Sequence, residues 1–569
     1  METTASDRAG RASDRVSRAF ARIRETGRPE VWITLRDEAD VAAEAVEIDR
    51  RVAAGEALPL AGMLCAIKDN IDVAGLPTTA AHPEFSHLPE RSATVVLRLR
   101  AAGAIVLGKT NLDQFATGLV GTRSPYGAVR NSVFPDRISG GSSSGSAVAV
   151  ALGIVDFALG TDTAGSGRVP AALNGIVGIK STRGLVPVDG VVPACRSYDC
   201  VTAFAATVEL ATQVTSIMSG VSEVDPVSRA WPADVALAAP PTPRIAIPAP
   251  EFLTALSAAR RELFTASVDT LVAAGAVVAE IDIAPFLECA TLLYDGALVA
   301  ERYAAYGDFI TAHPSGADPT VARIVAGAAA RHGYDVVKDQ DKVAHYRLEA
   351  ERLLAGFTAM LVPTAPEHPT LAAVADDPIG VNSRMGIFTN FMNLLDLAGV
   401  AVPAGQTDDG LFGVTVVVRG FDDQIAIDLA SILTGETPVV LPTGWIELAV
   451  FGAHLGGQPL NGQLVSLGAR FLTAASTSDD YRMYALPGAV AKPGVVRVEP
   501  GTGVRLDGEI WAMSPAALGS FLASLPQPMS LGKIVLDDGR EVLGFGCAWP
   551  QGADISSFGG WRAYRASLA

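Results

Sequence analysis

Histidine, cysteine and aromatic residues are all scarce in this chain of 569 residues. None of its seven histidines stands in nucleophile-like surroundings, and no Gly-x-Ser-x-Gly elbow occurs, which argues against Ser-His-Asp catalysis. The five cysteines are scattered without metal-ligand spacing. We therefore expect reduced thiols, no metal ion and no other cofactor.

Acidic residues outnumber basic residues, and long apolar runs are missing. The net charge of −17 argues against nucleic-acid binding through a basic surface. No apolar run has the length needed to cross a bilayer, and the polar residues 1–27 lack the apolar centre of a secretory signal. We expect a cytoplasmic protein that binds neither nucleic acid nor membrane, with a transit peptide as the alternative for the first residues.

Apolar residues are plentiful at 49%, enough for an extended core, and the length exceeds that of one ordinary domain. Short β-branched runs alternate with amphipathic helical patterns, which is typical of an α/β fold with helices on both faces of a mixed sheet. Strands are predicted at 61–67, 104–108, 244–247, 360–363 and 414–419, and helices near 11–26, 92–102, 147–159, 207–219, 252–274, 318–331, 336–356 and 423–433.

The pattern changes after about residue 434. Turn-rich residues 435–444 predict a linker, and a strand at 446–451 begins a smaller strand-rich unit. We therefore predict one domain over 1–440 and a second over 446–569. The Pro-rich residues 239–243 predict a surface connector between two halves of the first sheet and not a domain boundary.

Three segments, 67–70, 140–146 and 160–171, combine into one candidate nucleophilic site. Small residues flank Ser166, so its hydroxyl can stand clear of the backbone while nearby N–H groups converge on an oxyanion. Lys68 follows a short apolar strand, and a buried amine can act as a base near neutral pH. Ser142 or a neighbour could relay the proton. Each segment alone fits a flexible loop or a surface charge equally well.

Together the three segments resemble the amidase signature family, whose members use a Ser–cis-Ser–Lys triad. The resemblance implies that Ser166 is the nucleophile and Lys68 the base. It implies that Ser142 bridges them, following a cis peptide bond from Gly141.

The same resemblance describes the loop around the nucleophile. It implies an oxyanion hole formed by the backbone N–H groups of Thr163, Ala164 and Gly165, together with that of the nucleophile. Asp162 and Arg168 are expected to form a structural ion pair beneath this loop.

Two further segments depart from the broader family pattern. Arg123-Ser124-Pro125 stands where other members have Glu-Asn-Ser, and Cys200-Val201 stands where Gly-Pro is expected. These variants, and a C-terminal segment opening at 451–461, resemble the allophanate hydrolases of this family. The resemblance implies hydrolysis of allophanate, releasing ammonia and carbon dioxide in urea and nitrogen metabolism, with a urea carboxylase or another upstream enzyme as supplier. We also expect a homodimer.

Allophanate carries a carboxylate, so its recognition requires a fixed cation. Tyr294 and Arg302 lie eight residues apart on one helical pattern, about 12 Å along the axis and about 80° around it. Their spacing resembles that of the substrate-binding tyrosine and arginine of allophanate hydrolases, and a planar guanidinium suits a carboxylate. The alternative is an ordinary surface arginine beside a half-buried tyrosine.

The second domain resembles a small α+β fold of the gamma-glutamylcyclotransferase type. In some allophanate hydrolases its counterpart is thought to process the unstable dicarboxylated product of the first reaction. His454 is the candidate catalytic residue there, with Glu509 as a second candidate, and a role in dimer contact or partner docking is the alternative. For the whole chain, the rivals are an amidase or amidotransferase subunit of different specificity and a non-catalytic scaffold.

Overall fold

The computed structural model describes residues 11–488 and 490–568. The first ten residues of the segment considered for a secretory signal lie outside this range. Contacts divide the chain into two compact units, one of residues up to 230 with 242–439, the other of residues 231–241 with 440 onward. The predicted division into 1–440 and 446–569 stays a prediction.

The larger unit is built on one mixed sheet of eleven strands. In sheet order the strands are β1 Trp32–Leu35, β3 Ile105–Thr110, β2 Leu64–Lys68, β4 Phe157–Asp162, β6 Cys200–Ala205, β5 Val177–Lys180, β10 Ala398–Thr407, β11 Gly410–Val418, β9 Ala359–Pro363, β7 Arg244–Pro248 and β8 Val277–Ile281. Strand β2 pairs in parallel with β3 and β4, strand β7 pairs in parallel with β8 and β9, and the other pairs of this sheet are antiparallel.

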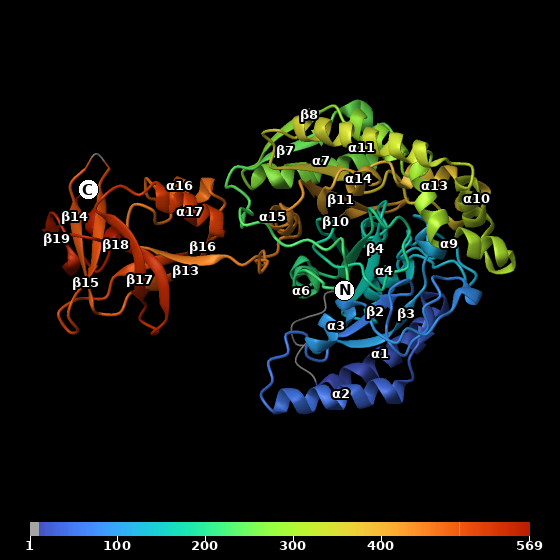
Figure 1. The fold of residues 1–569 in the computed structure, drawn as a ribbon, viewed down its shortest axis with the longest axis horizontal. Helices are drawn as coiled ribbons and strands as arrows, with labels where there is room; N and C mark the ends of the chain where they lie inside the picture. The colour runs from blue at the N-terminus through green and yellow to red at the C-terminus, as the bar shows by residue number, and fades with distance from the viewer. Residues whose placement is uncertain (1–10, 489, 569) are drawn as a thin grey trace. The chain divides into compact units, whose positions relative to one another are not determined.

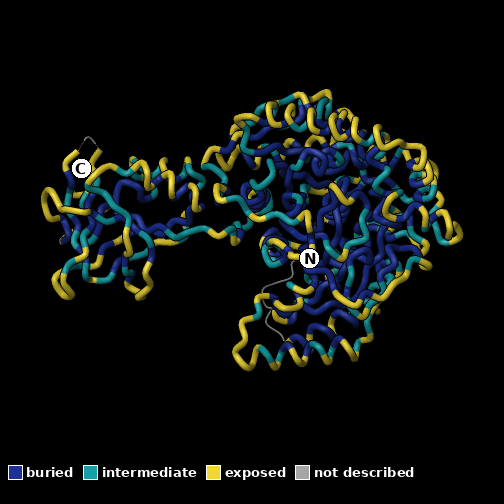
Figure 2. Tube along the Cα trace, in the orientation of Figure 1, coloured by how far each residue is buried: buried dark blue, intermediate teal, exposed yellow. Residues whose placement is uncertain are grey.

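Helices cover this sheet, and Figure 1 shows α1 and α2 side by side near β3, with α7 and α11 near β7 and β8 at the other end of the unit. Figure 2 shows buried chain through its middle and exposed turns at its outside. The α/β prediction is therefore confirmed. The helices are α1 Ala12–Thr26, α2 Glu38–Ala53, α3 Thr94–Ala101, α4 Ser144–Ala151, α5 Val169–Asn174, α6 Val208–Met218, α7 Ala258–Ala273, α8 Ala284–Thr291, α9 Ala300–Ala312, α10 Pro319–Ala328, α11 Gly333–Leu353, α12 Leu371–Asp376, α13 Gly380–Met385, α14 Phe391–Leu394 and α15 Asp423–Thr434.

Two of the predicted helices are wrong in part. The run 147–159 contains the end of α4 and the start of β4, separated by Gly153 with φ +66°, a left-handed conformation that ends a helix. Periodicity cannot separate a buried helix from a buried strand in so apolar a run. The predicted helix 252–274 is a short 3-10 turn, Pro250–Leu253, followed by α7 from Ala258.

The prediction for the Pro-rich residues 239–243 is wrong in part: they lie between β6 and β7 of the large sheet, but a boundary between the two units falls inside them, after Pro241. Residues 231–241 belong to the second unit, because Leu237 N donates to Gly468 O at 2.8 Å and Ala516 N donates to Ala233 O at 2.9 Å. The segment therefore supplies part of the smaller unit's packing from a distant point in the sequence.

The second unit is a small, strand-rich α+β body with its own hydrophobic core. Its five-stranded sheet has the order β13-β16-β12-β18-β17, and a three-stranded sheet has the order β15-β14-β19. The elements are β12 Ile446–Val450, α16 Asn461–Ser466, β13 Arg470–Ser476, β14 Tyr481–Leu486, β15 Lys492–Arg497, β16 Asp507–Met513, α17 Pro515–Ala523, β17 Met529–Val535, β18 Glu541–Cys547, β19 Ala553–Asp554 and α18 Trp561–Ser567. Its likeness to gamma-glutamylcyclotransferases stays a prediction.

In the part of the chain that the structure describes, no helix combines the length and apolarity needed to span a bilayer. All five cysteines there are buried and unbridged.

Candidate active site

The candidate active site forms where two parallel strands end side by side. β2 pairs with β4 with Ile67 opposite Leu159, so Lys68 and Thr161 emerge at the same edge of the sheet. The carboxyl ends of parallel strands are where α/β folds collect functional side chains. β2 is buried on both faces, which is why the residues before Lys68 form an unbroken apolar run.

Three hydroxyl groups surround the fully buried Lys68 amine. Its Nζ lies 2.7 Å from Ser142 Oγ, 3.0 Å from Ser143 Oγ and 2.8 Å from Thr161 Oγ1. Burial lowers the pKa of Lys68 from 10.5 to about 7, and the more distant carboxylates, Asp113 first among them, oppose that shift. A large part of the amine is therefore neutral near pH 7.

The hydrogen bonds around Lys68 indicate which hydroxyl faces its lone pair when the amine is neutral. Ser143 donates its own proton to Thr161 O at 3.1 Å, so Ser143 Oγ accepts from Nζ. Thr161 Oγ1 already accepts from Asn70 Nδ2 at 3.3 Å and has a second lone pair for Nζ. Ser142 and Thr161 can therefore each donate a proton to the neutral amine, and a relay to the nucleophile requires that Ser142 does so.

Backbone contacts hold the serine loop in this position. The peptide bond between Gly141 and Ser142 is cis, as the resemblance implied. Asp113 N donates to Ser142 O at 3.1 Å, and the Asp113 carboxylate accepts from Gly121 N at 3.0 Å. A Cβ at Gly141 would lie 2.7 Å from Gly121 N and collide with the Asp113 carboxylate, so the loop requires glycine there.

Ser166 lies on the loop between β4 and α5, with its side chain nearly buried. Its Oγ is 3.5 Å from Gly118 O, and no hydrogen bond joins it to Ser142 in the described chain. The structure thus brings Lys68 and Ser142 into contact and leaves the last link of the predicted relay open. Catalytic hydrogen bonds in ligand-free sites are often long and tighten only with substrate bound.

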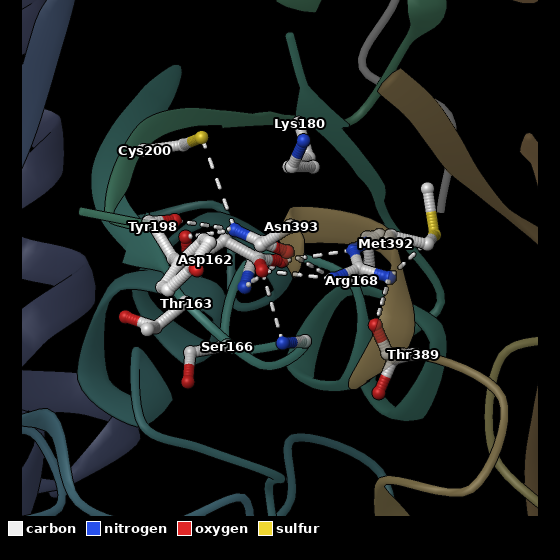
Figure 3. Close-up of polar contacts among 12 residues, drawn as sticks. Asp162, Thr163, Ser166, Arg168, Lys180, Tyr198, Cys200, Thr389, Met392 and Asn393 are labelled. Carbon is white, nitrogen blue, oxygen red and sulfur yellow. Dashed lines mark hydrogen bonds and ion pairs between the residues drawn. The ribbon is translucent and has the colours of Figure 1, made fainter. Parts of the chain in front are cut away.

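A buried ion pair supports the nucleophile loop from below. Arg168 Nε and Nη2 donate to the two carboxylate oxygens of Asp162 at 2.9 and 2.8 Å, and both side chains are fully buried. Figure 3 shows the guanidinium held between Asp162, Met392 and Asn393, with the Ser166 hydroxyl pointing away from the pair. Burial raises the pKa of Asp162, but the charge and hydrogen bonds of Arg168, with the Lys180 charge and the Gly167 N–H, together outweigh it and the net shift is downward. The expected structural pair is present.

The Asp162 carboxylate also affects the backbone N–H groups that were predicted to form the oxyanion hole. The Asp162 carboxylate accepts from Gly165 N at 2.9 Å, so this N–H, predicted for the oxyanion hole, already has a partner. The N–H groups of Thr163, Ala164 and Ser166 have no acceptor among the described residues. These three remain to receive an oxyanion.

Tyr294 and Arg302 converge, but not along one helix. α8 ends at Thr291, a short 3-10 turn covers Ala297–Val299, and α9 begins at Ala300, so the predicted axial geometry is wrong. The turn brings the Tyr294 ring centroid within 4.6 Å of Arg302 Cζ. Arg302 is fully buried, not a surface residue as the alternative supposed.

The Arg302 guanidinium has no hydrogen-bond partner on any of its three nitrogens among the described residues. Its charge acts on buried Asp199, which accepts from Thr163 Oγ1 and from the N–H groups of Ala194 and Cys195. A buried cation without acceptors is costly, and near the nucleophile loop it is suited to receive an anionic ligand.

Sequence reasoning missed several polar residues of the site: Ser143, Thr161 and Asp199. Ser143 and Thr161 complete the Lys68 environment, and Asp199 links the Arg302 region to the nucleophile loop. A signal existed for Thr161, because it lies near the end of a buried strand that is parallel to that of Lys68. Asp199 lies far along the sequence from both, so only the fold reveals it.

The smaller unit contains a cavity of about 400 Å³, and His454 and Lys492 are among the residues that line it. His454 Nε2 is 2.9 Å from Gln463 Oε1, and its ring stacks on Phe545 with centroids 4.9 Å apart. Burial lowers the pKa of His454, so its imidazole is neutral near pH 7.

Glu509 is placed differently from His454. Its carboxylate accepts from Gly456 N at 2.8 Å, Trp511 Nε1 at 3.0 Å and Arg562 Nη2 at 2.6 Å. These contacts use its acceptor capacity within the fold, which favours a structural role.

The fold is that of an amidase. A model of the amidase family matches residues 15–426, more than half of the chain, so the chain belongs to this family. A model of the allophanate hydrolase C-terminal domain matches residues 446–566.

Curated relatives match most of the chain, across both family models. Urea amidolyase of Saccharomyces cerevisiae is 42% identical over 547 residues, 90% of this chain but 30% of that protein. Urea amidolyase of Lachancea kluyveri is 41% identical over 570 residues, 94% of this chain and 31% of that protein. The chain thus spans about 30% of the length of the urea amidolyases it matches.

Solved structures agree over nearly the whole chain. Allophanate hydrolase of Kluyveromyces lactis is 38% identical with a TM-score of 0.87, covering 99% of this chain and 98% of that one. Urea amidolyase of K. lactis is 38% identical with a TM-score of 0.88, covering 98% of this chain and 36% of that one.

Proposed function

We propose that this protein hydrolyses allophanate through an acyl-serine intermediate on Ser166. Neutral Lys68 accepts a proton from Ser142, which accepts the proton of Ser166 as that oxygen attacks the amide carbonyl. The N–H groups at 163, 164 and 166 stabilise the oxyanion, and the Lys68 ammonium returns its proton through Ser142 to the leaving nitrogen, so that ammonia departs. Water then attacks the acyl group by the same relay and releases the dicarboxylated product.

The observation that carries this proposal is the unpartnered Arg302 guanidinium. It is fully buried, keeps its charge at neutral pH, has no hydrogen-bond partner among the described residues, and lies near Asp199, whose carboxylate holds Thr163 of the nucleophile loop. A planar fork of free donors complements a carboxylate, and the carboxylate of allophanate is separated from the reacting carbonyl by one nitrogen. Tyr294 covers the guanidinium and completes the pocket.

We assign the two reactions to separate parts of the chain. Residues 1–440 form the amidase domain and residues 446–569 a domain that processes the dicarboxylated product, with His454 as the catalytic base. Support comes from the neutral His454 imidazole and the Lys492 ammonium on one cavity, which has no Asp or Glu among the described residues of its lining. The supplier of allophanate is an upstream carboxylase of urea, and the enzyme acts as a cytoplasmic homodimer without a metal or organic cofactor.

An amidase or amidotransferase activity on other amides is the rival. It gives Arg302 no ligand, whereas a substrate carboxylate satisfies the buried cation. A non-catalytic scaffold likewise leaves the lowered pKa of Lys68 without a role.

The test is ammonia release from freshly prepared allophanate, compared with biuret, malonamate, glutamine and urea. Allophanate should be preferred by about a hundredfold or more over biuret, since losing a buried charge pair costs roughly 3 kcal/mol. Ser166→Ala should reduce the rate by about 10⁴-fold or more. Faster turnover of glutamine than of allophanate would overturn the assignment.

A further inference from the structure

A separate cavity of about 530 Å³ lies between α8, α10 and α13 and has Tyr294 in its lining. Tyr294 lines this cavity, and the centroid of its ring lies 4.6 Å from Arg302 Cζ, so the same residue borders the cavity and contacts the buried guanidinium. Asn382, on the same wall, accepts from Leu119 N at 2.7 Å, next to the Gly118 carbonyl that Ser166 contacts. The cavity therefore backs directly onto the candidate active site.

The charge of this cavity is opposite to that of the protein. Arg123, Arg323 and Arg331 line it, with Asp295 as the single acidic side chain among the described residues of the lining. The chain as a whole carries a net charge of −17, so its average field repels anions. A local excess of positive charge at the approach to Arg302 offsets that repulsion for a small anion.

The three arginines are held differently. Arg123 is buried and donates to Thr117 O and Pro378 O, which fixes it in the wall. Arg331 donates to the backbone of Asp295 at 2.9 Å. Arg323 is exposed on α10 and makes no hydrogen bond or ion pair in the described part of the chain, so its charge is free to act on solutes in the cavity.

We propose that this cavity is the entry route for a small carboxylate substrate, that Arg323 steers the anion into it, and that Tyr294 must swing aside to let the carboxylate reach Arg302. The inference rests on the proposed function and adds a selectivity step ahead of the chemistry. An uncharged amide can use the same route but gains nothing from Arg323.

The test compares kcat/KM of Arg323→Gln and Arg323→Glu for allophanate and for malonamide, an uncharged amide, at low and high salt. At low ionic strength Arg323→Glu should lower kcat/KM for allophanate by about fivefold, and Arg323→Gln, which removes one charge and not two, by about the square root of that factor. The change should reside in KM, disappear at about 0.5 M salt, and be absent for malonamide.

Arg18→Glu is the matched control. Arg18 is also exposed, lies on α1 and lines a different cavity of the same unit, so this variant changes net charge equally without touching the entry route. Equal losses in Arg18→Glu and Arg323→Glu would overturn the proposal, and so would losses that are the same for allophanate and malonamide. Failure of the unmodified enzyme to release ammonia from allophanate would instead refute the proposed function, so the two failures are distinguishable.

Discussion

The titration of Lys68 gives the sharpest prediction about the catalytic machinery. With a pKa of about 7, roughly three-quarters of the amine is neutral at pH 7.5, whereas an exposed lysine with a pKa of 10.5 would be neutral in about one molecule per thousand. Burial among three hydroxyls therefore raises the amount of competent base by several hundredfold. We expect kcat/KM to rise about tenfold per pH unit below pH 7 and to level off above it.

The assay uses an uncharged amide such as malonamide between pH 5.5 and 9, because its own charge does not change there. kcat/KM reports the ionisation of the free enzyme, so its inflection should fall near pH 7. Lys68→Met should lose activity at every pH, since no other group among the described residues contacts Ser142 as a base. An inflection near pH 10, or a flat profile, would refute the assignment of Lys68.

Three further predictions follow from the same contacts. Arg302→Met should lower kcat/KM for allophanate by about a hundredfold and leave malonamide turnover within about threefold, as steady-state kinetics would show; equal losses would contradict its role. The lowered pKa of Lys68 means that the unfolded chain binds one more proton between pH 7 and 10.5, so its contribution to the unfolding free energy rises with pH by about 1.4 kcal/mol per unit. Denaturant titrations should therefore show the unfolding free energy of wild type rising relative to that of Lys68→Met by about 1.4 kcal/mol per pH unit across this range. Gly165→Ala should destabilise by about 1–3 kcal/mol, because Gly165 has φ +138° and a new Cβ would lie 2.7 Å from Thr389 Cβ, while Gly327→Ala in α10, with open space around it, should not.

Much of the site could be predicted because its parts are local. Lys68 ends an apolar run, and such a run implies a buried strand and hence a desolvated amine. The loops of Ser142 and Ser166 are rich in small residues, which marks close backbone approach. The α/β alternation likewise follows from short-range patterns.

What could not be predicted depends on contacts between distant segments. Gly165 N is used by the Asp162 carboxylate, which no spacing rule reveals. Tyr294 and Arg302 meet across a turn and not along a helix, so the expected convergence is correct although its predicted path is wrong. Residues 231–241 pack with the smaller unit because of backbone hydrogen bonds formed across more than two hundred residues.

The most direct test of the central claim is the identification of the acylated residue. Enzyme mixed with allophanate, quenched in acid within milliseconds and digested, should yield a peptide containing Ser166 that carries the acyl group left after ammonia departs. The modification should be absent in Ser166→Ala. Acylation of any other side chain, or ammonia release by Ser166→Ala at the wild-type rate, would contradict the account.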